Sequence, residues 1–198
     1  MHISEGVLSL PVITIGYALT AAGVGIGLKQ LKDEDIVKTA VFSAAFFIAS
    51  LIHVPLGPSN VHLILNGLVG LLLGPVSFCA IFLALLLQAI LFQFGGLTSL
   101  GVNTFNMAMP ALLCYVIFFK LIKGNNLPLV IIGFLTGFIS VLISALLLSI
   151  SLILSGEHFT VSAKLIFIAH IPVMVTDGII TAIVLQFIKK VKPEILCV

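Results

Sequence analysis

The chain has 198 residues, of which 61% are hydrophobic and 8% are charged, and its formal net charge is +2. Soluble proteins carry about 25% charged residues, so this composition excludes a soluble domain and predicts an all-α protein that crosses the membrane several times. A transmembrane β-barrel is excluded because no alternating segments of roughly ten residues occur. We therefore expect the lipid bilayer, and no nucleic acid, around this protein.

Seven hydrophobic segments follow one another and predict a single integral membrane domain over residues 1–198. The predicted helices cover about 8–28, 36–54, 61–73, 76–94, 105–122, 127–154 and 164–188. We expect the first helix to be retained rather than cleaved as a signal peptide, because the preceding MHISEG contains Glu5 and no Lys or Arg.

The third segment is unusually short. At about 1.5 Å per residue, a helix over 61–73 would cover roughly 20 Å, well below the ~30 Å of a hydrocarbon core. A short helix of this kind has irregular ends that need protein partners, so we expect a binding site beside it.

The lysines predict how the chain is oriented in a prokaryotic cell membrane. With seven spans, one face carries eight of them, and Lys164 alone lies on the other face. Lysine-rich connections stay in the cytoplasm, which predicts an extracellular N-terminus and a cytoplasmic C-terminus. The eight are Lys29, Lys32, Lys38, Lys120, Lys123, Lys189, Lys190 and Lys192.

Polar residues near the outer face are the candidate site, because buried polar groups in membranes tend to be functional. His62 and Asn66 are four residues apart and would share one face of the short helix. Asn103 and Asn106 lie in GGLTSLGVNTFNM, which we interpret as a glycine-rich loop leading into the fifth helix. The full set is Met1, His2, Glu5, His53, Ser59, Asn60, His62, Asn66, Asn103 and Asn106.

The start of the chain can chelate a metal. A free α-amine, the amide nitrogen of residue 2 and Nδ1 of His2 close a five-membered and a six-membered ring around one ion. Three nearly coplanar nitrogens leave one corner of a square for another imidazole, and square-planar nitrogen sites suit Ni(II) and Cu(II). The alternatives are that His2 belongs to a disordered tail and that His62 makes an ordinary polar contact.

Four stretches resemble the substrate-binding subunit of nickel/cobalt energy-coupling-factor (ECF) transporters. They are MHISEG, GPSNVHLILNGLVGLLLGP, QAILFQFGGLTSLGVNTFNM and HIPVMVTDGIITA, and they occur in this order over nearly the whole chain. The resemblance implies a seven-helix bundle with the N-terminus inserted into it. It also implies a Ni(II) or Co(II) site formed by Met1, His2 and a central histidine, which matches His62.

The resemblance also implies partners and a division of labour. The family works with a transmembrane coupling subunit and ATP-binding cassette ATPase subunits, sometimes with a small accessory membrane subunit. This chain has no GxxxxGK[ST] phosphate loop, so we expect no enzymatic activity in it and ATP hydrolysis in the partners. Close helix approach to a partner is predicted at small-residue pairs, namely Ala40/Ala44, Ala45/Ala49 and Ala18/Ala22, although packing within the bundle is equally compatible with each pair.

These observations favour high-affinity capture of Ni(II) at the outer face, with Co(II) as the alternative ion. The VHLILNG stretch resembles the nickel branch, and the planar nitrogen set suits Ni(II). A self-sufficient divalent-cation channel or secondary transporter is a less favoured alternative, because Asp177 is the one intramembrane carboxylate. We expect Asp177, seven residues after His170, either to pair with a charged group or to be hydrogen-bonded. An intramembrane metalloprotease is disfavoured because HExxH is missing.

Overall fold

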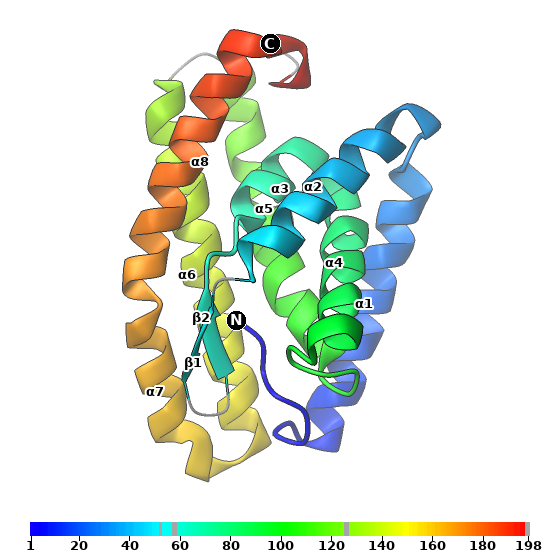
Figure 1. The fold of residues 1–198 in the computed structure, drawn as a ribbon, viewed down its shortest axis with the longest axis vertical. Coiled ribbons are helices and arrows are strands. Elements are labelled where there is room, and N and C mark those ends of the chain that lie inside the picture. Colours follow the sequence, from blue (N-terminus) through cyan, green and yellow to red (C-terminus); the bar gives the residue numbers. More distant parts are fainter. Residues whose placement is uncertain (52, 57–58, 125–126, 197–198) are drawn as a thin grey trace.

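The structure is a computed structural model that describes residues 1–51, 53–56, 59–124 and 127–196, with the backbone alone for 53–56, 59–61 and 123. The described chain is nearly all helical and contains one small hairpin (Figure 1). Its elements are α1 (Leu10–Gln30), α2 (Ile36–Ala49), β1 (His53–Leu56), β2 (Ser59–His62), α3 (Asn66–Leu73), α4 (Ser77–Phe92), α5 (Leu100–Gly124), α6 (Leu129–Ser155), α7 (Thr160–Ala169) and α8 (Ile171–Val191).

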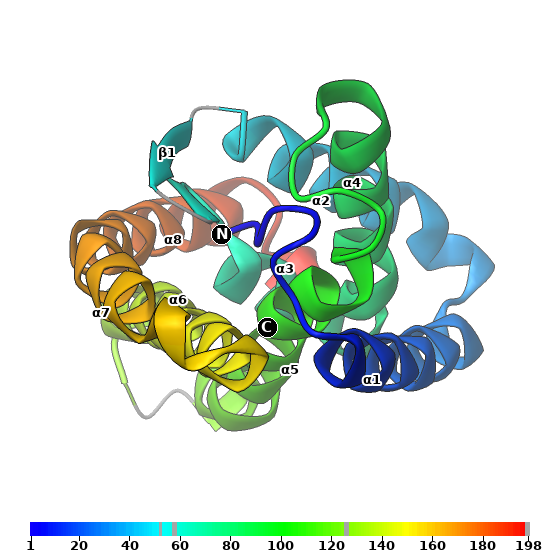
Figure 2. The same cartoon turned by 90° about the horizontal axis from the view of Figure 1, so that it is seen from below.

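The long helices surround the short helix α3. Helix α5 packs against α1, α3, α4 and α6, while α6 packs along α8. Figure 2 shows α3 and the start of the chain near the centre of the bundle, with the longer helices around them. Residues 66–72 are all buried, because their surroundings are protein and not lipid. The short helix therefore has the protein partners that its length led us to expect.

Glycines let α3 approach its neighbours this closely. A Cβ atom at Gly70 would lie 2.1 Å from the carbonyl oxygen of Ala111 in α5. A Cβ atom at Gly67 would lie 2.6 Å from the carbonyl oxygen of Thr136 in α6. Small residues at such contacts allow helix backbones to touch, which is how helices associate tightly in membranes.

The predicted helix over 61–73 is wrong at its start. His62 ends strand β2, which pairs antiparallel with β1 so that His53 stands opposite His62. Leu65 adopts a left-handed conformation with φ of 57°, and α3 begins only at Asn66. His62 and Asn66 therefore do not share a helix face. Short apolar runs such as VHLIL fit a strand as well as a helix, which explains the error.

Three other boundaries differ from the prediction. The second helix ends at Ala49, because the residues from His53 onward form the hairpin. Helix α5 begins at Leu100, so Asn103 and Asn106 lie on the helix and not in a preceding loop. The last segment consists of two helices, α7 and α8, which meet at His170 just before Pro172. Proline lacks a backbone donor, so a helix boundary commonly lies next to it.

Five helical stretches of the described chain are long and apolar enough to span a membrane. They are Leu10–Gln30, Asn66–Phe92, Leu100–Ile122, Leu129–Ser155 and Glu157–Val191. The third and fourth predicted segments form one of these stretches, interrupted at Gly74, and α2 has only 14 residues. The seven-span count thus stays a prediction, whereas the helical fold class is confirmed for the described chain, with the small hairpin as its one addition.

Candidate metal site

The first three residues are buried among the helices. Met1 is 1% exposed, His2 is 2% exposed and Ile3 is fully buried. The side-chain amide of Asn103 accepts a hydrogen bond from the Ile3 backbone N–H at 2.9 Å and donates one to the Ile3 carbonyl oxygen at 3.1 Å. Asn103 also donates to Ser99 Oγ at 3.1 Å. The backbone next to His2 is therefore attached to the first turn of α5.

A second contact holds the following residues against the loop before α5. The backbone N–H of Thr98 donates to Glu5 Oε1 at 3.1 Å. Gly95 and Gly96 have φ values of +79° and +102°, and Cβ atoms there would lie 2.7 Å from Asn103 Nδ2 and from Glu5 Oε2, respectively. Glycine is required at both positions for conformation and for space. The GGLT stretch and the MHISEG stretch thus pack against each other and form one structural unit.

The imidazole rings of His2 and His62 lie against each other in this buried region. Their centroids are 4.8 Å apart and the planes are inclined by 27°, which is a stacked arrangement. The ring of Phe94 covers His2 from another side, with a centroid distance of 6.1 Å. His62 is 3% exposed. The structure therefore brings together the two histidines that the sequence identified as ligand candidates.

The hydrogen bond of His62 leaves its other nitrogen available to a metal ion. Nδ1 lies 2.7 Å from the carbonyl oxygen of Leu63, and a carbonyl can only accept, so Nδ1 carries the proton. Nε2 is then an unprotonated acceptor, and it has no hydrogen-bond partner among the described residues. Metal-binding histidines commonly donate their second ring N–H to a carbonyl in this way, which fixes the tautomer.

Burial also favours the uncharged form of these groups. It lowers the pKa of the Met1 amine well below its usual 8.0, although the Asp177 carboxylate opposes this shift. Burial, the Met1 amine, His2 and His170 together lower the pKa of His62 well below 6.5, against the opposing effect of its bond to Leu63. Deprotonated nitrogen atoms are the form in which an amine and an imidazole bind metals.

Asp177 fixes the segment that follows His62. Its carboxylate is fully buried in α8 and accepts hydrogen bonds from the backbone N–H groups of Ile64 and Leu65, both at 3.2 Å. The expectation that Asp177 is hydrogen-bonded is confirmed. These bonds satisfy backbone donors in the irregular stretch before α3, where no helical partner exists.

The sequence did not predict that the buried His170 would lie beside this site. It is fully buried at the junction of α7 and α8, and its Nδ1 donates to the Ile166 carbonyl oxygen at 2.7 Å. Its Nε2 has no hydrogen-bond partner in the described part of the chain. Its charge affects the pKa of His62, which places it near the two stacked rings.

The other predicted site residues either connect helices or have side chains outside the described residues. Asn66 donates to the Met107 carbonyl oxygen at 2.8 Å and to Ser144 Oγ at 2.9 Å, which joins α3 to α5 and α6. Asn106 donates to Ser151 Oγ at 3.3 Å, between α5 and α6. Both amides connect helices. The side chains of His53, Ser59 and Asn60 lie outside the described residues.

Side chains alone do not form a metal site here. Among the described residues, no group of three or more His, Cys, Asp or Glu side chains is arranged to hold an ion. A metal site at His2 and His62 would therefore need donors other than His, Cys, Asp and Glu side chains among the described residues. The buried amine of Met1 and the amide of His2 are the nitrogen atoms nearest along the chain.

The alanines proposed for partner docking differ from the glycines next to them. Ala18, Ala22, Ala40, Ala44 and Ala45 are exposed, whereas Ala49 is half-buried. Gly23 and Gly27 of α1, by contrast, face Phe78 and Cys79 of α4, where added Cβ atoms would clash. The alanine pairs remain accessible to another protein, and the glycines serve packing within the bundle.

Comparison with known proteins places the chain in a family. The family model described as "Cobalt uptake substrate-specific transmembrane region" (CbiM) matches residues 2–195. A Haemophilus influenzae protein named for metal transport is 41% identical over 199 residues, 99% of this chain and 97% of that protein. An Archaeoglobus fulgidus protein named NikMN, for fused nickel transport, is 27% identical over 202 residues, 99% of this chain and 68% of that protein.

A solved structure agrees with this placement. The crystal structure of a truncated transition metal transporter superposes with a TM-score of 0.87 at 26% identity, and it covers 96% of this chain and 99% of that chain. The family that the sequence motifs resembled is therefore confirmed. The chain belongs to the CbiM family and is a multi-pass membrane protein that serves as a metal transport component of the CbiM/NikM type.

Proposed function

We propose that this protein captures Ni(II) as the substrate-binding subunit of an ECF importer. The ion, which is the transported substrate, is bound by four nitrogen atoms: the Met1 amine, the amide of His2, His2 Nδ1 and His62 Nε2. The first three close two chelate rings at one end of the chain, and His62 supplies the fourth corner.

One observation carries this proposal. The rings of His2 and His62 are 4.8 Å apart in a buried region, although 59 intervening positions separate the two residues in the sequence. His62 presents an unprotonated Nε2 without a hydrogen-bond partner among the described residues, and burial lowers the pKa of both the Met1 amine and His62. These are the properties that a nitrogen site for a metal cation requires.

The choice of nickel follows from the donor set. Amine, amide and imidazole nitrogens in one plane favour Ni(II), which accepts square-planar coordination, over ions that prefer tetrahedral or octahedral geometry. One relative is named for nickel transport, and the matching family model is named for cobalt uptake. Co(II) is the alternative substrate at the same site.

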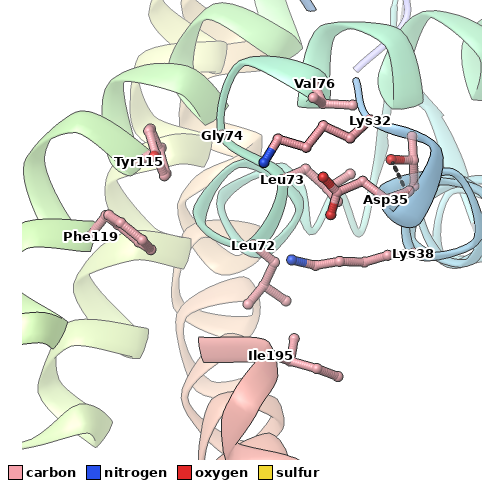
Figure 3. A pocket seen from close by; sticks show the side chains of 11 residues that line it. Lys32, Asp35, Lys38, Leu72, Leu73, Gly74, Val76, Tyr115, Phe119 and Ile195 are labelled. Carbon is pink, nitrogen blue, oxygen red and sulfur yellow. Dashed lines mark hydrogen bonds between the residues drawn. The ribbon is translucent and has the colours of Figure 1, made fainter. Parts of the chain in front are cut away.

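We propose that the site opens to the outer face and that the opposite end contacts the partners. Lys32 and Lys38 line the same cavity as Ile195 (Figure 3), so the connection between α1 and α2 lies at the same end of the bundle as the residues just after α8. Lysine-rich ends favour the cytoplasm. A coupling subunit with ATPase subunits, and where present an accessory subunit, would then use the exposed alanines of α2.

A self-sufficient secondary transporter is less consistent with the geometry. Such a transporter uses intramembrane carboxylates that exchange ions or protons. The carboxylate of Asp177 instead accepts hydrogen bonds from two backbone N–H groups and so fixes the chain before α3.

A competition titration tests the proposal. Purified protein should bind one Ni(II) per chain with the visible absorption of a square-planar diamagnetic centre, and Co(II) should displace it only at higher concentration. Stronger binding of Co(II) would reverse the choice of ion. An octahedral Ni(II) spectrum would reject the four-nitrogen site.

A further inference from the structure

The ring of His170 has one nitrogen atom that the fold leaves without a partner. His170 is fully buried at the junction of α7 and α8. Because its Nδ1 donates to the Ile166 carbonyl oxygen at 2.7 Å, Nε2 carries no proton and can only accept a hydrogen bond. No described residue donates to this Nε2. Buried polar atoms in native proteins nearly always have a partner, so this acceptor requires an explanation.

The inner face of α8 lies along the chain segment that contains His62. Asp177 accepts hydrogen bonds from the backbone N–H groups of Ile64 and Leu65, which follow His62. His170 is seven residues before Asp177 on the same helix face, so about 10 Å separates them along the helix axis. Helix α7 packs against strand β2, which ends at His62. His170 therefore lies beside the strand that carries His62.

The Met1 amine lies in the same region. Figures 1 and 2 both show the start of the chain beside the hairpin, and Met1 is 1% exposed. The amine interacts electrostatically with both His62 and His170. The start of the chain therefore lies close to both histidines, although only His62 is one of the four proposed metal ligands.

We propose that His170 is a positioning residue of the metal site, whose Nε2 accepts a hydrogen bond from the Met1 amine while that amine binds the ion. This inference rests on the proposed function. An amine that gives its lone pair to a metal keeps two N–H groups, so it can bind the ion and donate to Nε2 at the same time. The acceptor holds the amine lone pair toward the ion and strengthens the amine as a ligand.

The bond between His170 and Ile166 is part of this arrangement. It keeps the proton on Nδ1, and the opposite tautomer would turn an N–H group toward the N–H groups of the amine. The carbonyl oxygen of Ile166 thus holds the ring in the tautomer that the amine requires. Leu63 does the same for the tautomer of His62.

Two replacements separate the nitrogen atoms of the ring. The side-chain amide of asparagine can donate from the position of Nδ1, whereas that of glutamine can accept at the position of Nε2. His170→Asn keeps the bond to Ile166 without the acceptor, and it should weaken Ni(II) binding by roughly 10- to 100-fold in calorimetric titration. His170→Gln should recover most of this loss. The opposite order of affinities would assign His170 to the bond with Ile166 alone and overturn the proposal.

Spectroscopy distinguishes a positioning residue from a metal ligand. His170→Asn saturated with Ni(II) should keep the square-planar absorption of the wild type, because the four ligands are unchanged. In the wild type loaded with diamagnetic Ni(II), the nitrogen NMR signal of His170 Nε2 should be that of an unprotonated nitrogen that accepts a hydrogen bond. A signal of a protonated or metal-bound Nε2 would overturn the proposal, and this measurement needs no variant to fold.

A matched control and the wild type separate the possible failures. Thr181→Val removes another fully buried polar group from α8, eleven residues after His170, and should bind Ni(II) like the wild type. Equal losses in Thr181→Val and His170→Asn would mean that packing of α8 is responsible and would overturn the proposal. A wild type without square-planar Ni(II) would overturn the proposed function itself. A wild type with that centre and an equal affinity in His170→Asn would overturn only the role of His170.

Discussion

The side-chain amide of Asn103 forms hydrogen bonds with both the N–H and the carbonyl oxygen of Ile3. An asparagine in the first turn of α5 therefore holds the backbone immediately after His2, much as a neighbouring β-strand would. Because His2 is fixed on this side and His62 ends strand β2 of the short hairpin, the relative position of the two rings depends on both attachments.

Replacement of Asn103 by alanine should weaken Ni(II) binding by roughly 10- to 100-fold, the usual effect of losing a group that orients a metal ligand. Asn106→Ala is the matched control, because it removes an amide one turn further along α5 that binds Ser151 and not the N-terminal residues. Calorimetric titration of both variants would show the difference. Equal affinity losses would mean that Asn103 stabilises the bundle without orienting His2.

Replacement of His62 by alanine should weaken Ni(II) binding by more than about 100-fold, since loss of a ligand exceeds the loss of an orienting group. The three remaining nitrogen atoms leave the fourth corner of the square to water, which should also shift the visible absorption. His158→Ala serves as the control, because His158 is exposed beside Phe159. Full affinity in His62→Ala would show that another residue occupies that corner.

Gly96→Ala should weaken Ni(II) binding about tenfold. Its φ of +102° is unfavourable for alanine by roughly 1–2 kcal/mol, and the new Cβ would collide with Glu5. Gly25→Ala is the control, because that position is helical with open space around it. Should the Gly96 variant bind as tightly as Gly25→Ala, the contact between GGLT and MHISEG would be irrelevant to the site.

Acidification should lower both the stability of the metal-free protein and its affinity for Ni(II). The folded-state pKa values of the Met1 amine and of His62 lie below 8.0 and 6.5, so the unfolded chain binds more protons in the window below these values. The free energy of unfolding therefore rises with pH through that window, and acidification lowers it again. Thermal unfolding in detergent between pH 8 and 5 measures this dependence, which His62→Gln should reduce.

Much of the candidate site could be predicted because the chemistry proposed for it is local. His2 follows the first residue, so amine, amide and imidazole are automatically in chelating positions, and the pairing with His62 followed from topology and the family resemblance. The hairpin could not be predicted, because a short, mostly apolar run such as VHLIL fits either a helix or a strand, and the strand at Ser59–His62 depends on pairing with 53–56.

The sequence also could not predict the contacts that hold the segments next to His2 and His62. Asn103 was a candidate by its polarity, but its bonds to Ile3 join positions 100 residues apart. The hydrogen bonds that the N–H groups of Ile64 and Leu65 donate to Asp177 likewise join positions 113 and 112 residues apart. The paired MHISEG and GGLT stretches were both recognised as motifs, and only the fold shows that they touch.

The central claim is that the amine of Met1 is a metal ligand, and a removable N-terminal tag tests it most directly. Protein carrying the tag should bind Ni(II) weakly and lack the square-planar absorption, and cleavage that leaves Met1 as the first residue, verified by mass spectrometry, should restore both. Protein with the same tag at the C-terminus should bind normally throughout. Equal Ni(II) affinity and an identical spectrum before and after cleavage would contradict the account.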